Sequence, residues 1–509
     1  MARLRRFYPR ECVIGMSDKT HRDMADETGE ALGVILRAEN GDVIRYDETG
    51  LILRLSDRVV ADIAARIGAV LPASGGAATG PAAGLEGALP DEVDAWDLRA
   101  DGDWLRFTAS LPGRQGARGF RRHRSGGAIL ADARGPLNVL LGIGGARAAL
   151  GLTDEASHYP HHILSPADDI GAVGHAGIEV AAATEALEPV RDKTHEVLVA
   201  ERLLDRRLAD GLALPLIAVR VETDESHDAR ALAQGRAVAN LDQAAKNLVR
   251  AAARLGTHAK LLAVTLDYAL EDQSGDRAAY RDGMIAVMEE ATVRLGKLGF
   301  AQPLFLATFD CGTHRITESP ALAGQWDLSW NHAAHRLTYV APGYAFAQDA
   351  TARLTADGCH DRAVLYAAAL QAVEADGDWR CPVIHLAEAQ GQTIRAVCAS
   401  ALELVIDKAD PFGAGKTAGF RLVGAGAPKI LKVEIDPADD KAVLLHCSAP
   451  VPATGVKLAY AYGAPAGEGP FPPNSGALRD SWSGSAGTRP LHRWALPALL
   501  PVQPAGRTS

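Results

Sequence analysis

The sequence predicts an α/β protein, in which a parallel β-sheet is flanked by helices, with a small α+β module before it and a β-sandwich after it. Three observations predict this class. Strand-like and helix-like segments alternate from residue 136 to residue 385, short apolar runs separated by turn signals precede residue 70, and short alternating runs broken by glycine and proline follow residue 386. A chain of 509 residues is too long for one hydrophobic core, so several domains are expected.

The segments before the sheet are predicted from their composition. Short strand-like runs and an amphipathic segment at 57–70 predict an α+β attachment module over residues 1–70. Residues 71–90 are rich in glycine, alanine and proline, which predicts a linker. Residues 91–135 are expected to form a connecting β segment. Its arginine cluster either contacts a polyanion or acidic sugar or, as we interpret it, forms a solvated face, because runs of charge usually do.

The central segment, 136–385, contains the alternating pattern. Buried strands are predicted at 137–141, 214–221, 260–266, 303–308 and 337–341. Helices are predicted at 194–211, 232–255, 277–298 and 362–374. Such alternation is typical of a parallel sheet that is covered by helices on both faces.

The last segment, 386–509, has a different texture. Antiparallel strands are predicted at 401–406, 418–423, 429–435, 442–446 and 456–462. Their short and regular spacing predicts a β-sandwich. The apolar tail at 491–501 is expected to pack back onto the body of the protein.

The composition argues against several classes of protein. A formal charge of −10 argues against nucleic-acid binding, which depends on neutralising phosphates. No apolar run approaches the ~18 residues that span a bilayer, so membrane insertion is not expected. No apolar region follows the basic N-terminus, so we expect a product made in the cytoplasm without a signal peptide. The 6 cysteines lack the CxxC spacing of a zinc site.

The first strand of the central segment ends in a candidate site. Residues 142–145 read Gly-Ile-Gly-Gly, and a helix-compatible run follows them. Glycine permits a tight turn, and a helix N-terminus presents unpaired N–H groups above the sheet. A dinucleotide site is not expected, because Arg147 stands where the fingerprint requires a third small residue. We therefore predict no cofactor.

Histidine-containing patterns elsewhere are weaker candidates. Consecutive side chains diverge, so the Ser-His-Asp run at 226–228 cannot form a catalytic triad. His158, His161 and His162 either bind a metal ion or, as we interpret them, lie in a surface loop, because no matched carboxylate or cysteine spacing accompanies them. No metal site is predicted.

Two motifs of the central segment match a known family. The turn at 142–146 fits a Gly-Gln-Ser-Asn/Leu-Ala turn at Gly142 and Ala146, and the run at 353–358 fits His-Leu-Thr-Ala-x-Gly except that arginine replaces the histidine. On these residues the segment 136–385 resembles the SGNH/GDSL hydrolases, and among them the sialate O-acetylesterase type of carbohydrate esterase. The resemblance implies an SGNH-like, flavodoxin-like fold. It also places Gly144 at the position of the nucleophilic serine and Arg353 at that of the basic histidine.

The resemblance leaves a second register open. Asp357 and His360 have the Asp-x-x-His spacing with which the family orients its base. In either register no serine follows Gly142, so an acyl-transfer nucleophile is missing.

The family's two oxyanion-donor blocks also differ in this sequence. They correspond to 221–230 and 269–272, which contain carboxylates that would repel a developing oxyanion. The resemblance thus implies a fold that is kept and a chemistry that is lost. The ligand-binding residues it suggests are Gly144, Arg147, Asp224, Glu271 and Arg353.

Taken together, the sequence suggests a non-catalytic carbohydrate-binding spike or fibre protein of a phage-like particle or gene transfer agent. In this hypothesis residues 1–70 attach to other particle proteins, and a homo-oligomer on the particle surface binds the cell-surface polysaccharide of a host. One alternative is an active carbohydrate O-acetylesterase that uses Asp357 and His360. Another is a purely structural virion protein.

Overall fold

The computed structural model describes four strands within the first 88 residues and then residues 89–506, apart from positions 91, 151–154, 176–178, 350 and 376. The chain clusters into two compact units, Met1–Glu86 and Gly87–Ser509. The domain boundaries expected near residues 136 and 386 fall inside the second unit and stay predictions.

The N-terminal unit contains an antiparallel sheet whose strands follow one another in chain order. These strands are β1 (Arg22–Ala25), β2 (Ala31–Arg37), β3 (Val43–Asp47) and β4 (Gly50–Arg54). The strand-like runs of the sequence lie in this sheet. The helix expected at 57–70 lies outside the described residues.

The connecting segment forms a second antiparallel sheet, of β5 (Ala95–Asp101), β6 (Trp104–Ala109), β7 (Arg118–His123) and β8 (Leu130–Ala131). Phe107 and Phe120 pair across β6 and β7 and are buried. Arg121 is also buried: its guanidinium lies 5.2 Å from the Trp104 ring centroid and donates to the Leu255 carbonyl. The arginine cluster is therefore not a solvated face throughout.

The main sheet confirms the α/β class. Its strands lie in the order β12 (Leu187–Pro189), β10 (Ile163–Pro166), β13 (Ile217–Thr223), β9 (Leu137–Gly144), β14 (Ala259–Asp267), β15 (Leu304–Phe309) and β16 (Arg336–Pro342), and β11 (Val173–Gly174) also pairs with β13. All neighbours are parallel except β12, which pairs with β10 in the antiparallel sense. Counted along the chain, the five long strands have the order 2-1-3-4-5, which is typical of flavodoxin-like sheets.

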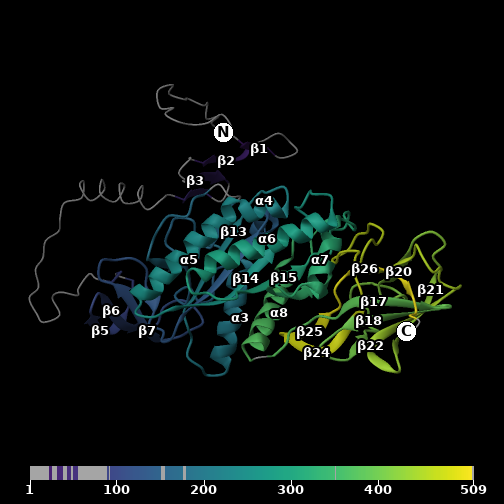
Figure 1. Cartoon of the computed structure of the whole chain (residues 1–509). Helices are drawn as coiled ribbons and strands as arrows, with labels where there is room; N and C mark the ends of the chain where they lie inside the picture. The colour runs from purple at the N-terminus through teal and green to yellow at the C-terminus, as the bar shows by residue number, and fades with distance from the viewer. Residues whose placement is uncertain are drawn as a thin grey trace, which may run out of the picture. The chain divides into compact units, whose positions relative to one another are not determined.

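Helices cover both faces of this sheet (Figure 1). One layer is formed by α3 (His195–Ala209) and α8 (Ala356–Glu374), and the other by α4 (Ala229–Gln234), α5 (Arg236–Arg254), α6 (Arg277–Gly296) and α7 (Pro320–Asn331). The central strand β9 shows why the sheet is buried on both sides: Val139 and Leu141 belong to one core and Leu140 to the other.

Two helices differ from their predicted bounds. The helix expected at 232–255 is two helices, because Gly235 has an extended conformation (φ −77, ψ 177) and is the N-cap of α5. The helix expected at 362–374 begins at Ala356, since Thr355 caps it by accepting from the Gly358 N–H at 3.1 Å.

The C-terminal region contains the predicted antiparallel strands, divided among three sheets in the described residues. The first has the order β21 (Ile430–Asp436), β22 (Asp439–Cys447), β18 (Thr393–Ala399), β17 (Val383–Gln390) and β27 (Gln503–Pro504). The second is β19 (Leu404–Ile406), β24 (Leu478–Ala486) and β25 (Arg489–Trp494), and the third is β20 (Phe420–Val423), β23 (Lys457–Tyr460) and β26 (Ala498–Pro501). The tail packs back as expected, because β26 pairs with β23 and buries Leu500.

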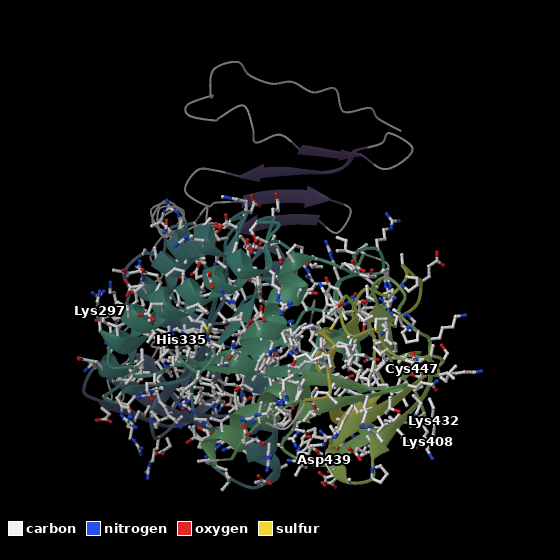
Figure 2. All side chains as sticks on the ribbon, turned by 45° about the vertical axis from the view of Figure 1, so that its right-hand side comes forward. Lys297, His335, Lys408, Lys432, Asp439 and Cys447 are labelled. Atoms are coloured by element: carbon white, nitrogen blue, oxygen red, sulfur yellow. The ribbon has the colours of Figure 1, made fainter. Side chains whose placement is uncertain are left out.

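One apolar core joins the C-terminal sheets to the α/β part of the second unit. It runs from Phe107 to Val502 without a break between the two parts. Trp326 of α7 donates to the Ile384 carbonyl at 2.7 Å, and Tyr344 donates to the Ala495 carbonyl at 2.7 Å. Figure 2 shows the C-terminal strands, near Lys432 and Asp439, beside the helices that they contact. Among the described helices, none has the length and apolarity to cross a membrane.

Candidate functional site

A cavity opens where the parallel strands β14, β15 and β16 end, beside the turn that follows β9. We call it the strand-end cavity; its volume is about 180 Å³. Ligands of open α/β sheets bind at this edge, near the point where the strand order reverses, which here lies between β9 and β14. Its polar walls include Arg147, Asp267, Thr308, Asp310, Arg353 and Arg362.

Arg147 enters the cavity from α2 (Ala146–Leu150), the short helix that starts directly after the glycine turn. Its guanidinium forms an ion pair with Asp310, which follows β15. That carboxylate raises the pKa of Arg147 further above its ordinary value. Asp310 is itself held in place, because its other oxygen accepts from the Gly312 N–H at 2.8 Å. The pair therefore holds a hydrogen-bond donor, Arg147, and an acceptor, Asp310, in fixed positions in the wall.

A second ion pair closes the opposite wall. Arg362 of α8 is buried and donates to Asp267 Oδ2 at 3.2 Å and to His195 Nδ1 at 3.2 Å. Burial is the largest influence and acts to lower the pKa of Arg362, but the Asp267 carboxylate together with Tyr366, Cys359 and Glu196 makes the net shift upward. Both guanidiniums of these pairs thus stay charged.

Gly144 lies beneath the cavity and presents no surface to it. A Cβ atom at this position would lie 2.4 Å from the Cβ of Ala148 and 2.7 Å from the carbonyl oxygen of Asp267. The turn is therefore packed against β14. It does not have the open geometry that a nucleophilic serine requires.

Glu271 supports the same turn from behind. Its carboxylate accepts from the backbone N–H of Arg147 at 3.2 Å and from that of Ala269 at 3.3 Å. Burial raises the pKa of Glu271, and the positive charge of Arg147 opposes that shift. Glu271 thus positions Arg147. It is not among the residues that line the strand-end cavity.

Asp224 has a structural contact set. Its Oδ2 accepts from the Ala237 N–H at 3.2 Å, in the first turn of α5, and its Oδ1 accepts from the Ser226 hydroxyl at 2.9 Å. Its backbone N–H donates to the Gly144 carbonyl at 3.1 Å. The residue lies next to the glycine turn, but its carboxylate caps a helix.

Arg353 does line the strand-end cavity, from the loop before α8. Its backbone N–H donates to Asp349 Oδ1 at 3.0 Å, and its exposed guanidinium forms no ion pair with any described residue. Of the five predicted ligand-binding residues, two line one cavity, Arg147 and Arg353. Gly144 lies beneath that cavity and Glu271 behind the glycine turn. The Asp224 carboxylate binds the start of α5 instead.

No serine, and no hydroxyl or thiol beside a histidine, lines the cavity in the described part of the chain. The Thr351 hydroxyl lies beside a carboxylate, because it donates to Asp349 Oδ1 at 2.7 Å, and the same oxygen accepts from the backbone N–H groups of Thr351 and Arg353. The Thr308 hydroxyl is paired with the Tyr366 hydroxyl at 3.0 Å. The Cys311 thiol donates to the Phe309 carbonyl at 3.3 Å, and burial raises its pKa, so it stays protonated at neutral pH. No described histidine contributes to the cavity wall. This arrangement offers donors and acceptors to a polar ligand, and the described part of its wall contains no serine–histidine or cysteine–histidine pair of the kind used in acyl transfer.

Asp357 and His360 lie on the outer side of α8, in a different cavity. His360 pairs there with Glu155, with 3.3 Å between Nε2 and Oε1. The structure therefore does not bring these two residues to the glycine turn.

The sequence predicts a surface loop at 158–162, but part of this segment is buried. Tyr159 is 0% exposed and His162 is 2% exposed, because the segment passes beneath the connecting sheet and leads into β10. His162 donates from Nδ1 to the Pro215 carbonyl at 3.1 Å. Among the described residues, no three histidine, cysteine, aspartate or glutamate side chains form a group that could hold a metal ion.

Sequence reasoning missed Asp267, Asp310 and Arg362. A usable signal exists for the first two, because each lies at or just past the end of a buried strand predicted at 260–266 or 303–308. Parallel strands end at one edge of a sheet, so polar residues at those ends converge. Arg362 has no such signal, since its direction depends on how α8 packs.

Comparisons with known proteins give little for this chain. No family model matches it, and no relative is found among the curated proteins. Among solved structures, the crystal structure of a novel carbohydrate acetylesterase from Xanthomonas citri is similar over 92% of this chain and 95% of that one, with 14% sequence identity and a TM-score of 0.45. With this sequence identity and TM-score, the chemistry of that enzyme does not carry over to this chain.

Proposed function

We propose that the second unit, residues 87–509, binds a saccharide in the strand-end cavity without hydrolysing it. The observation that supports this is the cavity wall itself. Its described residues form two fixed ion pairs and include an unpaired arginine and several hydroxyl groups, but no serine and no hydroxyl or thiol beside a histidine. The SGNH-like identity of the fold belongs to the same proposal, supported by the 2-1-3-4-5 strand order and the position of the cavity.

The wall suits a ligand whose groups both donate and accept hydrogen bonds. Guanidinium groups offer planar donors, and Asp267 and Asp310 offer acceptors from the neighbouring strands. The Oε1 atom of Gln348, a buried residue of the wall, has no hydrogen-bond partner. Sugar hydroxyls satisfy both kinds of group at once.

The size of the cavity sets a limit on the ligand. A water needs roughly 10–15 Å³ of such volume, so a cavity of about 180 Å³ holds on the order of a dozen non-hydrogen atoms. That is one sugar ring with its hydroxyl groups. A polysaccharide would therefore insert a terminal or branching unit.

The proposal is tested by glycan-array binding and calorimetry with the full chain. Arg353→Ala and Gln348→Leu are expected to weaken saccharide binding roughly tenfold, since each removes a polar contact from a partly enclosed site. Arg336→Ala, an exposed arginine at the opposite end of β16, is the matched control and is expected to change nothing. Binding that is unaffected by both cavity variants would contradict the proposal.

An active carbohydrate O-acetylesterase is the contrasting outcome. Purified protein is expected to show no turnover of p-nitrophenyl acetate or acetylated xylan above background. Turnover that disappears in His360→Ala would replace the binding proposal by an esterase that works from the cavity containing Asp357 and His360.

We also propose, on the sequence alone, that residues 1–70 attach the protein to a phage-like particle and that several copies present the binding unit together. Immunogold labelling of particles from producing cells tests this. Labelled particles that lose the label when residues 1–70 are deleted would support a spike, and label confined to unassembled protein would contradict it. A labelled particle with no saccharide binding would favour a purely structural virion protein.

A further inference from the structure

The outer side of α8 forms a second cavity together with α3 and the β24–β25 hairpin. We call it the α3–α8 groove; its volume is about 1010 Å³. On α8 it is lined by Asp357, His360, Asp361, Val364, Ala368 and Gln371, which recur every three or four residues and so share one face of the helix. Arg362, which points to the strand-end cavity, lies on a different face.

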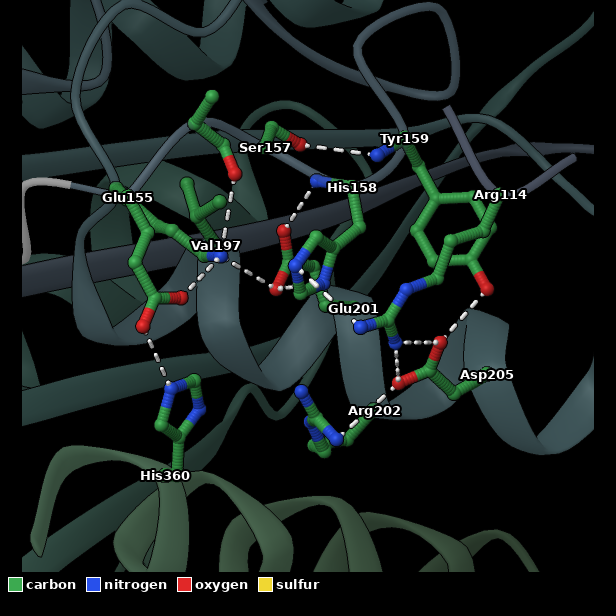
Figure 3. A network of polar contacts seen from close by, with 12 residues as sticks. Arg114, Glu155, Ser157, His158, Tyr159, Val197, Glu201, Arg202, Asp205 and His360 are labelled. Atoms are coloured by element: carbon green, nitrogen blue, oxygen red, sulfur yellow. Dashed lines mark hydrogen bonds and ion pairs between the residues drawn. The ribbon is translucent and has the colours of Figure 1, made fainter. Parts of the chain in front are cut away.

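The base of the groove is a built polar network (Figure 3). Lys193 and Glu201 are fully buried and lie 3.0 Å apart, measured from Nζ to Oε2. Lys193 also holds Glu155 Oε2 at 3.0 Å, and Glu155 in turn pairs with His360. The buried Lys193 thus holds Glu155, and through it His360, in place at the base of the groove.

The charges of the groove indicate a neutral ligand. Its arginines already have carboxylate partners: Arg114 and Arg202 pair with Asp205, and Arg489 pairs with Asp361 at 2.6 Å. An anionic ligand would have to displace these carboxylates, and a cationic ligand would lie among four guanidinium groups, those of Arg114, Arg202, Arg206 and Arg489.

Hydrogen-bond acceptors remain free on α8. Asp357 is exposed and has no ion pair with any described residue. Asp361 is 4% exposed, and its Oδ1 atom has no hydrogen-bond partner. The free groups thus call for a ligand with several O–H donors.

An aromatic ring completes the groove. Trp482 lines it and is held from behind by Trp379, with ring centroids 4.7 Å apart. Gly484 packs close beside this ring, because a Cβ atom there would lie 2.7 Å from it, and the Arg493 guanidinium lies 5.9 Å from the ring centroid. The half-buried indole lines the groove with its remaining exposed surface, which can pack against the C–H groups of a sugar ring while Asp357 accepts from the sugar hydroxyls.

From these contacts we infer that the α3–α8 groove is a second saccharide site, which takes a neutral oligosaccharide of several units along α8, with one unit on Trp482. The inference concerns a different cavity from the one in the proposed function and stands or falls separately.

Calorimetry with the full chain and three neutral probes, maltohexaose, cellohexaose and chitohexaose, tests it. At least one probe is expected to bind at about 1 mM or below, and Trp482→Ala is expected to weaken that binding roughly tenfold. Asp357→Asn is expected to weaken it roughly threefold. The matched controls are Trp330→Ala and Asp282→Asn, two exposed side chains of α7 and α6 outside both cavities.

Hexagalacturonate and spermidine distinguish the other ligand classes. Failure of all three neutral probes, binding of only the acidic or only the basic probe, or unchanged binding in Trp482→Ala would each overturn the inference. If Trp482→Ala does not fold, Ser485→Trp fills the groove from the exposed hairpin and is expected to abolish binding. Binding that survives Arg353→Ala but not Trp482→Ala assigns the saccharide to this groove even where the strand-end proposal fails.

Discussion

Individual residues decide whether the strand-end cavity can carry out chemistry. The sequence resemblance predicts Gly144 at the place of a nucleophile, and the surroundings of Gly144 leave no room for a side chain. The same resemblance predicts Arg353 at the place of the base, and an arginine cannot act as one, because its guanidinium does not lose a proton in proteins.

The first prediction concerns Gly144→Ser. The new Cβ would meet the Asp267 backbone and Ala148, and backbone cannot yield as a flexible side chain can. We expect a loss of about 1–3 kcal/mol in the free energy of unfolding and no esterase activity, even when combined with Arg353→His. Urea unfolding and p-nitrophenyl acetate turnover check this.

Gly299→Ser is a control for the added hydroxymethyl group, because a Cβ atom at Gly299 would have no other atom within 4 Å. The positive φ of Gly299, +89, adds backbone strain of its own. A stable and active double variant would show that the turn is open.

The second prediction concerns His162. Burial lowers its pKa from 6.5 to about 4, so the folded state excludes a proton that the unfolded chain takes up. The stabilisation is present above pH 6.5 and is lost as the pH falls towards about 4. Through this group alone the free energy of unfolding is expected to fall by roughly 2–3 kcal/mol over that range.

Urea unfolding at pH 7 and at about pH 4.5 measures this loss. His162→Phe is expected to reduce the difference between the two pH values. His227→Phe, at a side chain that is 73% exposed, is expected to leave it unchanged. Equal pH dependence in the wild type and in His162→Phe would contradict the prediction.

At the scale of elements, α8 connects the two cavities. Its inner face carries Arg362 to the strand-end cavity, and its outer face carries Asp357 and His360 to the α3–α8 groove. A motif that is contiguous in sequence is thus divided between two sites by the helical repeat. This is why Asp357 and His360 do not meet the glycine turn in either register.

The third prediction concerns the start of α5. Asp224 caps this helix through Ala237, so Asp224→Ala is expected to lower the free energy of unfolding by about 1 kcal/mol. It is expected to leave saccharide binding unchanged, because the carboxylate faces α5. Thermal melts and calorimetry measure the two effects, with Asp282→Ala on the exposed side of α6 as the control. A loss of binding without a loss of stability would return Asp224 to the ligand site.

At the scale of the whole molecule, the second unit behaves as one body. The apolar core that runs from Phe107 to Val502 does not stop at the end of α8. The C-terminal sheets supply Leu458, Tyr460 and Leu478 to it, so they cover apolar surface of the α/β part.

The fourth prediction follows from this shared core. A fragment of residues 87–385 is expected to show no cooperative thermal transition, because it would expose the surface that the C-terminal sheets cover. The fragment 87–509 is expected to unfold cooperatively, since Gly87–Ser509 is a compact unit. Circular dichroism melts of the two fragments check this. A cooperative transition in the shorter fragment would show that the α/β part folds alone.

The sequence alone determined the α/β class and most long elements, because the periodicity of apolar residues records which faces are buried. The strands predicted at 260–266 and 303–308 and the helix predicted at 277–298 all occur within a few residues of their predicted bounds. It also singled out Arg147 and Arg353, since both lie beside motifs. The prediction was wrong for the segment with Tyr159 and His162. Its polar composition suggested a surface loop, but packing against residues distant in the sequence buries both side chains.

Only the tertiary structure decided which polar residues share a site. Asp267, Asp310 and Arg362 come from three separate segments and meet because parallel strands end at one edge and α8 packs across it. The α3–α8 groove brings Trp482 and Asp361 together with side chains of α3. Each of these two residues is more than a hundred positions from α3 in the sequence. Distances of this kind are set by packing between elements, and local periodicity does not contain them.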